Sequence, residues 1–232
     1  ALVTHPLLDG LTVYGTQLAL PFSNHPFGVG SVFIIDPLVT LPWLAGTAWA
    51  LAARGSPAGL RANAVGLALG CTYLAFGFGA QQHVRQQAMA SLQSQGVQAE
   101  RVLVTPAAFS TLLWRVVAVD ADSYREGYRS LLDAPGPIAF DRFDRGAALE
   151  PEVAAIDGAQ RIRAFSRGFY KLHEADGLLR ISDLRMGAEP RYTFSFAVAQ
   201  RASPLQPLPV AQSVGGRPDV GRALPWWWRR LW

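Results

Sequence analysis

The sequence predicts an α+β fold in which N-terminal transmembrane helices precede a small antiparallel β-sheet domain with one covering helix. Three observations lead to this prediction. The front of the chain is nearly free of charge, since Asp36 is the only charged residue between Gly10 and Ala53. Behind Arg85 charges are frequent, and apolar residues alternate with polar ones, as in strands with one buried face. One later segment carries apolar residues at helical spacing.

The composition supports a membrane protein and argues against a nucleic-acid-binding one. Hydrophobic residues make up 50% of the chain and charged residues 16%, against about 25% charged residues in ordinary globular domains. The net charge of +4 comes from arginines that are spread among acidic residues, and Lys171 is the only lysine. Nucleic-acid binders instead gather basic residues on one face. The single cysteine, Cys71, excludes an internal disulfide and a CxxC metal site.

Two apolar runs are candidate membrane spans. Ala62–Gln82 holds 21 uncharged residues, and a helix of that length reaches roughly 30 Å, the thickness of the hydrocarbon core. Its Gly66 and Gly70 have the spacing that lets two membrane helices approach closely. Pro37–Ala53 is shorter, at 17 residues. It is just long enough to span the membrane if Val32–Ile35 extends the helix. We therefore expect a helical hairpin that crosses the membrane twice.

The turn "RGSPAGLR" joins the two runs. Arg54 and Arg61 flank this turn, which favours a cytoplasmic location for it, because basic loop residues stay on that side. The alternative for the same two runs is a pair of buried core helices in a soluble protein.

The chain divides into three parts. Residues 1–83 form a membrane helical region, residues 84–202 a soluble α+β domain, and residues 203–232 a Pro/Gly-rich tail with a Trp/Arg-rich end. The domain has predicted strands at "RVLVTP", "TLLWRVVAV", "SYREGYRSL", "LLRISDL" and "RYTFSFAVA", and an amphipathic helix over 150–169. The tail composition predicts disorder. Its end, "PWWWRRLW", suits either a membrane interface or packing on its own domain.

The candidate site residues of the front region all precede the apolar run Pro37–Ala53. His5 and Asp9 are four positions apart, so on a helix they share one face, as two ligands of a metal such as zinc do. A lone histidine in an apolar setting is more often a hydrogen-bonded structural residue. Asp36 lies inside "VFIIDPLVT", where a carboxylate in lipid is costly and marks a functional, here catalytic, candidate. It equally suits capping of a helix that begins at Pro37.

Several motifs in their expected order carry a resemblance to a known family. They are "THPLLDGLTVYGTQLALPFS", "VFIIDPLVTLP", "RVLVTPAAFSTLLWRVVAVDADSYREGYRSLLD" and "FSRGFYKL…LRISDLRMGAEPRYTFSFAV". Together they resemble the bacterial inner-membrane, LexA-regulated group that is classed as metal-dependent hydrolases, over Thr4 to Arg201. The resemblance implies a location in the bacterial inner membrane and makes His5 and Asp9 metal ligands, with zinc as the expected ion. It also implies hydrolysis of phosphoester or other ester bonds.

The chain also departs from that family. Members carry an earlier Pro-Asp-Leu-Asp stretch and a His-Arg…Thr-His-Ser motif that supply further ligands, and the residues before Thr4 are too few to hold them. We therefore expect a fragment or a processed form. For this chain taken alone, the missing ligands favour the alternative function, a non-catalytic membrane protein whose soluble domain binds a partner or lipid headgroups.

The soluble domain offers three arginines for an anionic substrate. Arg115, Arg167 and Arg185 lie inside the matching motifs and have the bidentate geometry that suits a phosphate or carboxylate. No G-x-S-x-G elbow, P-loop or dinucleotide fingerprint occurs, which leaves serine hydrolase, NTPase and dehydrogenase without support. The expected partners are membrane lipid and an anionic or ester substrate, with no nucleic acid.

Overall fold

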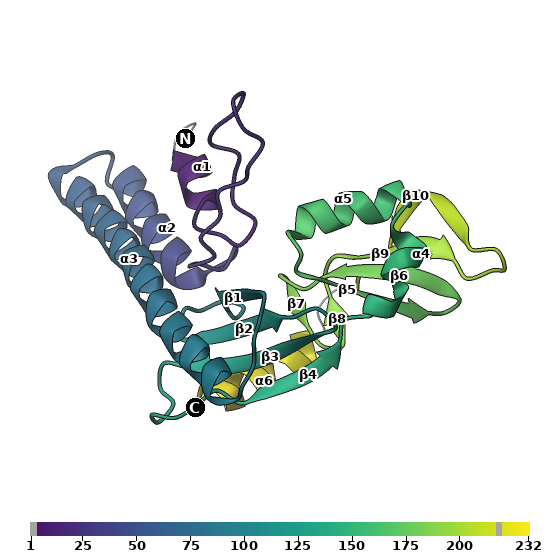
Figure 1. Ribbon diagram of the computed structural model, residues 1–232. Helices are drawn as coiled ribbons and strands as arrows, with labels where there is room; N and C mark the ends of the chain where they lie inside the picture. The colour runs from purple at the N-terminus through teal and green to yellow at the C-terminus, as the bar shows by residue number, and fades with distance from the viewer. Residues whose placement is uncertain (1–3, 217–219) are drawn as a thin grey trace.

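The computed structural model describes residues 4–216 and 220–232, and it contains a projecting helical arm, two four-stranded β-sheets and a two-stranded one (Figure 1). We use the term arm for residues 37–84. The elements are α1 (Thr4–Asp9), α2 (Pro37–Ala52), α3 (Pro57–Ser94), β1 (Arg101–Pro106), β2 (Leu113–Val119), β3 (Ser123–Ser130), β4 (Phe140–Asp144), η1 (Ala147–Leu149), α4 (Glu150–Val153), α5 (Asp157–Ser166), β5 (Tyr170–Ala175), β6 (Leu178–Asp183), β7 (Gly187–Ala188), β8 (Arg191–Tyr192), β9 (Ser195–Gln200), β10 (Gln206–Ser213) and α6 (Val220–Leu231). The α+β class is confirmed.

Helices α2 and α3 form the predicted antiparallel pair. Each begins with a side-chain cap followed by proline: Asp36 accepts a hydrogen bond from Leu38 N, and Ser56 accepts one from Gly59 N. The two helices approach closely where glycine leaves room. A Cβ at Gly66 would collide with the backbone of α2, and one at Gly70 would collide with the Trp43 ring. The small-residue spacing therefore predicted the contact correctly.

The lengths of the two helices differ from the prediction. Val32–Ile35 does not extend α2, whose 16 residues reach about 24 Å. Of the described helices, only α3 is long and apolar enough to cross a membrane, and α2 is a shorter apolar helix. The structure thus gives one candidate span, and a double crossing stays a prediction.

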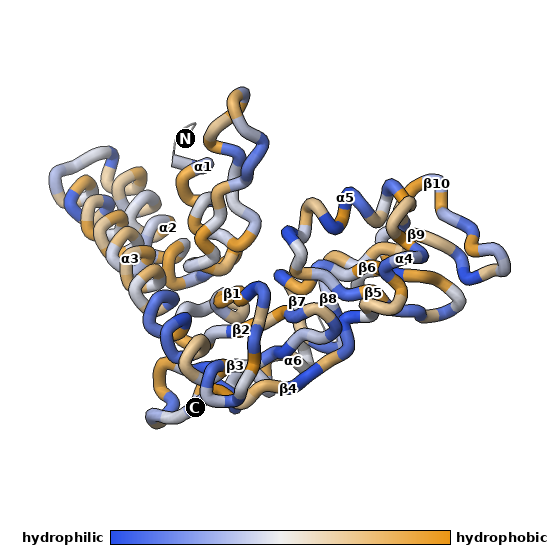
Figure 2. Tube along the Cα trace, in the orientation of Figure 1, coloured by the Kyte–Doolittle hydropathy of each residue, from blue (hydrophilic) through white to orange (hydrophobic). Residues whose placement is uncertain are grey.

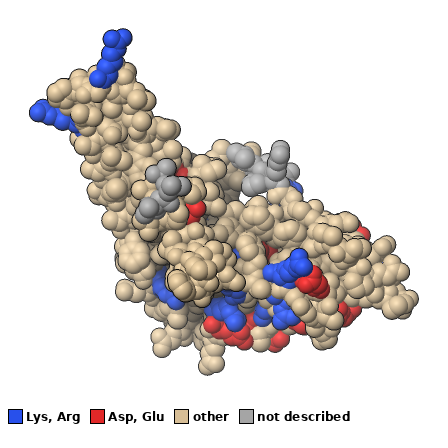
Figure 3. Space-filling view, turned by 90° about the horizontal axis from the view of Figure 1, so that it is seen from above, with Lys and Arg blue, Asp and Glu red and all other residues tan. Residues whose placement is uncertain are grey.

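The surface of the arm is apolar. Figure 2 shows hydrophobic residues along both helices, and Figure 3 shows charged residues on the arm only at its tip on the face in view. The exposed apolar side chains of the arm include Leu41, Leu44, Trp49, Leu51, Leu60, Val65, Leu67, Leu69, Phe76 and Phe78. Exposed apolar surface of this extent marks an interaction site with a membrane or a partner, so the alternative of two buried core helices is not supported.

Helix α3 continues beyond the arm and becomes part of the soluble domain. It runs unbroken to Ser94 across the expected boundary at residue 84. Its far half buries Val84 and Ala88 against Trp114 and Val116 of β2. The helix that forms the arm therefore also covers one face of the first sheet.

The first sheet has the order β1-β2-β3-β4 and is antiparallel. Strand β2 is buried along its whole length, because α3 covers one face and other elements cover the opposite one. The predicted strands at 101–106, 111–119 and 123–131 are confirmed to within two residues. Strand β4 was not predicted, since its "FDRFD" segment is mostly exposed.

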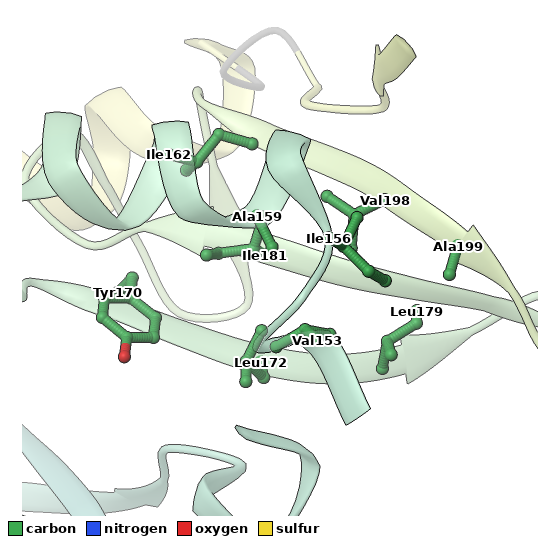
Figure 4. Packing of buried hydrophobic residues seen from close by; sticks show 10 residues of the cluster. All are labelled: Val153, Ile156, Ala159, Ile162, Tyr170, Leu172, Leu179, Ile181, Val198 and Ala199. Carbon is green, nitrogen blue, oxygen red and sulfur yellow. The ribbon is translucent and has the colours of Figure 1, made fainter. Parts of the chain in front are cut away.

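A second four-stranded sheet, with the order β10-β9-β6-β5, corrects the expectation of a single sheet. Helix α5 covers it, and Ile156, Ala159 and Ile162 pack against strand residues such as Leu179 and Ile181 (Figure 4). The single helix expected over 150–169 is in fact two helices, α4 and α5, separated at 154–156. Strand β5 was also missed.

The tail is ordered where the structure describes it, which corrects the predicted disorder. Strand β10 pairs with β9, and helix α6 packs on the first sheet. Leu231 of α6 is buried, and Ser130 donates a hydrogen bond to its carbonyl. Arg230 pairs with Asp133, and Trp226 meets Tyr128 edge to face. Of the two readings of "PWWWRRLW", packing on its own domain is the one the structure supports.

A first prediction concerns the contact between α2 and α3. Gly66→Ala should lower the thermal midpoint of unfolding in detergent micelles, because the new methyl group overpacks the contact at a cost of about 1–3 kcal/mol. Gly79→Ala is the matched control in the same helix, since nothing lies within 4 Å of a Cβ there. Thermal unfolding of both variants is measured by circular dichroism. Equal midpoints for the two variants would contradict a close contact between α2 and α3 at Gly66.

A second prediction concerns the far half of α3. A fragment that begins at Glu100 should aggregate, because removing α3 uncovers Trp114 and Val116 on the first sheet. A fragment that begins at Ala80 keeps that cover and should stay soluble. Gel filtration of the two fragments measures the difference, and a soluble, monomeric Glu100 fragment would show that α3 is dispensable for the sheet.

Candidate functional site

His5 and Asp9 face each other on α1. The Nε2 atom of His5 lies 3.3 Å from Oδ2 of Asp9, and the two side chains are 77% and 44% exposed. The helix positions them, because residues four apart share one face. The convergence that the sequence predicted is therefore present, and the histidine is not packed among apolar side chains.

Asp36 is almost fully buried, at 2% exposure. Its Oδ1 accepts a hydrogen bond from Leu38 N at 3.0 Å, which caps α2. Its Oδ2 accepts one from the Tyr73 hydroxyl of α3 at 3.0 Å, and the same hydroxyl accepts a bond from Thr111 N. The capping role is confirmed, and the carboxylate also joins α2, α3 and the loop before β2. A catalytic role stays a prediction.

A pocket of about 300 Å³ brings Asp9 and Asp36 together. It lies between α1, the following loop and the first two turns of α2, at the base of the arm. The residues that line it are Leu8, Asp9, Thr12, Tyr14, Gly15, Val32, Phe33, Ile34, Asp36, Val39, Thr40 and Trp43. His5 is outside this set, beside Asp9. Of the three candidate site residues of the front region, Asp9 and Asp36 therefore share one pocket.

Arg115 is buried between the two sheets. Its guanidinium is ion-paired with Glu126 of the neighbouring strand and donates to the carbonyl of Leu184 at 2.8 Å. Tyr192 donates to the same glutamate. The charge of Arg115 is thus neutralised inside the protein, and its predicted role with an anionic substrate has no direct support.

Arg185 is likewise paired within the chain. It makes a bidentate contact with Asp183. Its Nη2 atom lies 2.7 Å from Oδ2, and its Nε atom lies 3.0 Å from Oδ1 and 3.1 Å from Oδ2. Its guanidinium carbon lies 4.6 Å from the ring centre of Tyr14, a residue of the N-terminal loop, and 4.8 Å from that of Phe165. Tyr14 also stacks on Phe165. Arg185 therefore connects the front of the chain to the second sheet.

Arg167, like Arg115 at its Nε atom, has a buried donor without a hydrogen-bond partner in the part of the chain that the structure describes. Its Nη2 atom is buried and has no hydrogen-bond partner among the described residues. Burial, and then the nearby charge of Arg185, lower the pKa of the guanidinium. The side chain remains protonated, since arginine pKa values start far above neutrality. An anionic ligand would satisfy both the hydrogen bond and the charge.

Sequence reasoning missed Tyr14 and Tyr73. Tyr14 lines the pocket and contacts Arg185, and Tyr73 fixes Asp36. A tyrosine within each nearly uncharged stretch, 10–53 and 62–82, was a visible signal, because a buried aromatic ring with a polar tip makes specific contacts. The Tyr73 hydroxyl has hydrogen-bond partners, whereas the Tyr14 hydroxyl is buried without one among the described residues. The contacts of neither residue could be read from the sequence, since they join segments far apart in the chain.

The remaining histidines lie outside the site. His25 is an exposed loop residue that packs edge to face on Phe27. His83 bonds Gln87 one turn away on α3. Burial, together with the charges of Lys171 and Arg180, lowers the pKa of His173 to about 4, so that its ring is neutral at physiological pH.

The donor set fits a divalent metal in part. Two ligands at about 2.1 Å from a tetrahedral zinc lie about 3.4 Å apart, which is close to the His5–Asp9 separation. Within residues 4–216 and 220–232, no group of three or more His, Cys, Asp and Glu side chains could hold an ion. The pair supplies at most two of the three protein ligands typical of a hydrolytic site.

Comparison with known proteins concerns the front of the chain. Neither the curated proteins nor the solved structures that were compared gave a match. Residues 1–84, which include α1, the pocket and the arm, match the model of a family described as YdjM inner membrane protein. The match supports a bacterial inner-membrane protein and carries no information on hydrolysis, LexA regulation or a metal. The front part of the chain is thus similar to an inner-membrane protein family.

Proposed function

We propose that this chain forms part of a membrane-bound, metal-dependent hydrolase with its site at the base of the arm. The observation that supports the proposal is the exposed His5–Asp9 pair, with its 3.3 Å separation, beside the pocket that Asp9 lines. A structural ion pair of the same geometry would gain little, because exposed pairs contribute about 0–1 kcal/mol. The pair is therefore better explained by a ligand than by stability.

The proposed roles follow from the positions of the side chains. His5 and Asp9 hold a divalent ion, expected to be zinc. Such an ion supplies a bound water of lowered pKa and polarises an ester or phosphoester bond. Asp36 presents a carboxylate to the same pocket and is the candidate for holding a proton during hydrolysis. Arg167, with its unsatisfied Nη2 donor, is the candidate for an anionic substrate group.

The membrane topology belongs to the same proposal. Both helices of the arm cross the bacterial inner membrane, so that α1 and the soluble domain lie on one side. The Arg54–Arg61 turn then lies on the other, cytoplasmic side. The exposed apolar surface of both helices supports this arrangement, as does the match to an inner-membrane family.

A non-catalytic function is the second candidate, and helix α6 favours it. Trp226, Trp228 and Trp232 remain 39%, 60% and 74% exposed although the helix packs on the first sheet. Tryptophan is enriched where proteins bind one another or meet lipid headgroups. In this case the soluble domain binds a partner or lipid headgroups and the His5–Asp9 pair has no ligand.

The metal site has a direct test. Protein purified in detergent should contain zinc or another divalent ion by elemental analysis, and His5→Ala should reduce that content by at least tenfold, as loss of a direct ligand does. His25→Ala is the matched control, because His25 is also exposed and near the N-terminus. Equal metal content in the two variants would exclude His5 as a ligand and leave the non-catalytic function.

The two roles of Asp36 separate by substitution. Asp36→Ala should destabilise the protein by about 1–2 kcal/mol in thermal unfolding, because it removes the cap of α2. Asp36→Asn keeps an oxygen for Leu38 N but turns its amide toward the Tyr73 hydroxyl, which loses its acceptor, so it should destabilise the protein less than Asp36→Ala does. If the Asn variant keeps its full rate with an ester or phosphoester substrate, the carboxylate is structural only.

A further inference from the structure

We infer that the pocket at the base of the arm takes one acyl chain of a bilayer lipid, so that the site acts on a lipid ester or phosphoester. The chemical half of this inference rests on the proposed hydrolase function. The binding half rests on the pocket alone, and the two can be tested separately.

The residues that line the pocket are of two chemical kinds. Val32, Phe33, Val39 and Trp43 are apolar, and we call them the apolar wall, whereas Asp9 and Asp36 are acidic. Asp36 already accepts two hydrogen bonds, so an incoming apolar group does not strip it of its partners. An occupant that is apolar along its length and carries an ester at one end matches both kinds of residue.

The apolar wall is continuous with the surface of the arm. Ile34 lines the pocket and is 54% exposed, and its neighbours Ile35 and Leu38 are exposed as well. Leu41 extends the same surface along α2. A soluble substrate would leave this rim in water, at a cost of about 25 cal/mol for each Å² of apolar surface. An acyl chain that enters from the bilayer would contact apolar side chains from the surface of the arm to the pocket.

The size of the pocket suits part of a lipid. At about 300 Å³ it lies at the lower end of ligand sites, too small for a whole phospholipid and large enough for a length of one chain. Tyr14 lines the pocket and is held by Phe165 and Arg185 of the soluble domain. The headgroup of the lipid is thereby left between the arm and the domain.

Photolabelling with a lipid tests the occupant. The full chain is reconstituted in phosphatidylglycerol vesicles that contain a trace of phosphatidylglycerol with a diazirine on one acyl chain, and the labelled residues are mapped by mass spectrometry. Thr12 and Val32 line the pocket and are 9% and 6% exposed. We expect label on both, because a chain reaches these buried side chains only by entering the pocket.

A filled pocket provides the control. Thr40 lines the pocket and is exposed at its edge, so Thr40→Trp should abolish labelling of Thr12 and Val32. Leu41→Trp adds the same ring to the outer surface of α2 and should leave that labelling unchanged. Label confined to exposed arm residues, or label on Val32 that survives Thr40→Trp, would overturn the inference.

The outcome is independent of the metal. Labelling needs neither metal nor hydrolysis, so the His5→Ala protein should label as the unaltered protein does. If the unaltered protein is labelled on Thr12 and Val32 but contains no metal, the labelling supports a lipid chain as the occupant. The missing metal then counts only against the hydrolase function. If Thr40→Trp protein does not reach the vesicles, label on Thr12 and Val32 in the unaltered chain decides the question.

Discussion

The side chain of Gln81 joins the N-terminal segment, helix α3 and the first sheet. Its amide nitrogen donates to the carbonyls of Val29 and Gly30 in the N-terminal segment, at 2.7 and 3.0 Å, and to that of Val104 in β1, at 2.9 Å. An amide group is buried at this point, and leaving its donors unpaired would cost about 1–3 kcal/mol. The pocket depends on this contact, because the segment that carries Tyr14 and Val32 is fixed to α3 and to the first sheet through it.

A second constraint joins the two sheets. Arg115 and Glu126 on one sheet meet Tyr192 from the β7–β8 hairpin, and Glu189 of that hairpin is bonded in turn by Tyr124 and Lys171. Because breaking one member of such a network leaves a charge buried without its partner, the sheets are held in a single orientation. The cost is functional: an arginine engaged in this way is not free for a substrate. The same holds for Arg185 through Asp183. Arg167 differs in that its open donor is Nη2, at the end of the guanidinium.

Local patterns predicted the fold where the pattern was strong. The uncharged runs predicted both helices of the arm, and Gly66 and Gly70 predicted their contact. The β-rich composition of 111–119 predicted strand β2, and alternation predicted strand β3. The tail was misjudged, because Pro and Gly content describes a segment alone, whereas β10 and α6 are stabilised by pairing with β9 and by packing on Tyr128 and Ser130. In the site, the i, i+4 spacing of His5 and Asp9 predicted their contact, but the partners of Asp36 and Tyr14 come from distant segments that no local pattern specifies.

The unbroken length of α3 has a mechanical consequence. Its 38 residues form a rod of about 57 Å, with most of its length in the arm and its far end packed on the first sheet. Helix α3 is unbroken where the arm meets the soluble domain, so no loop separates the two. A bilayer that thins makes membrane helices tilt, and such a tilt would turn the whole sheet assembly with it. The orientation of the domain over the lipid surface is thus coupled to bilayer thickness through a single stiff element.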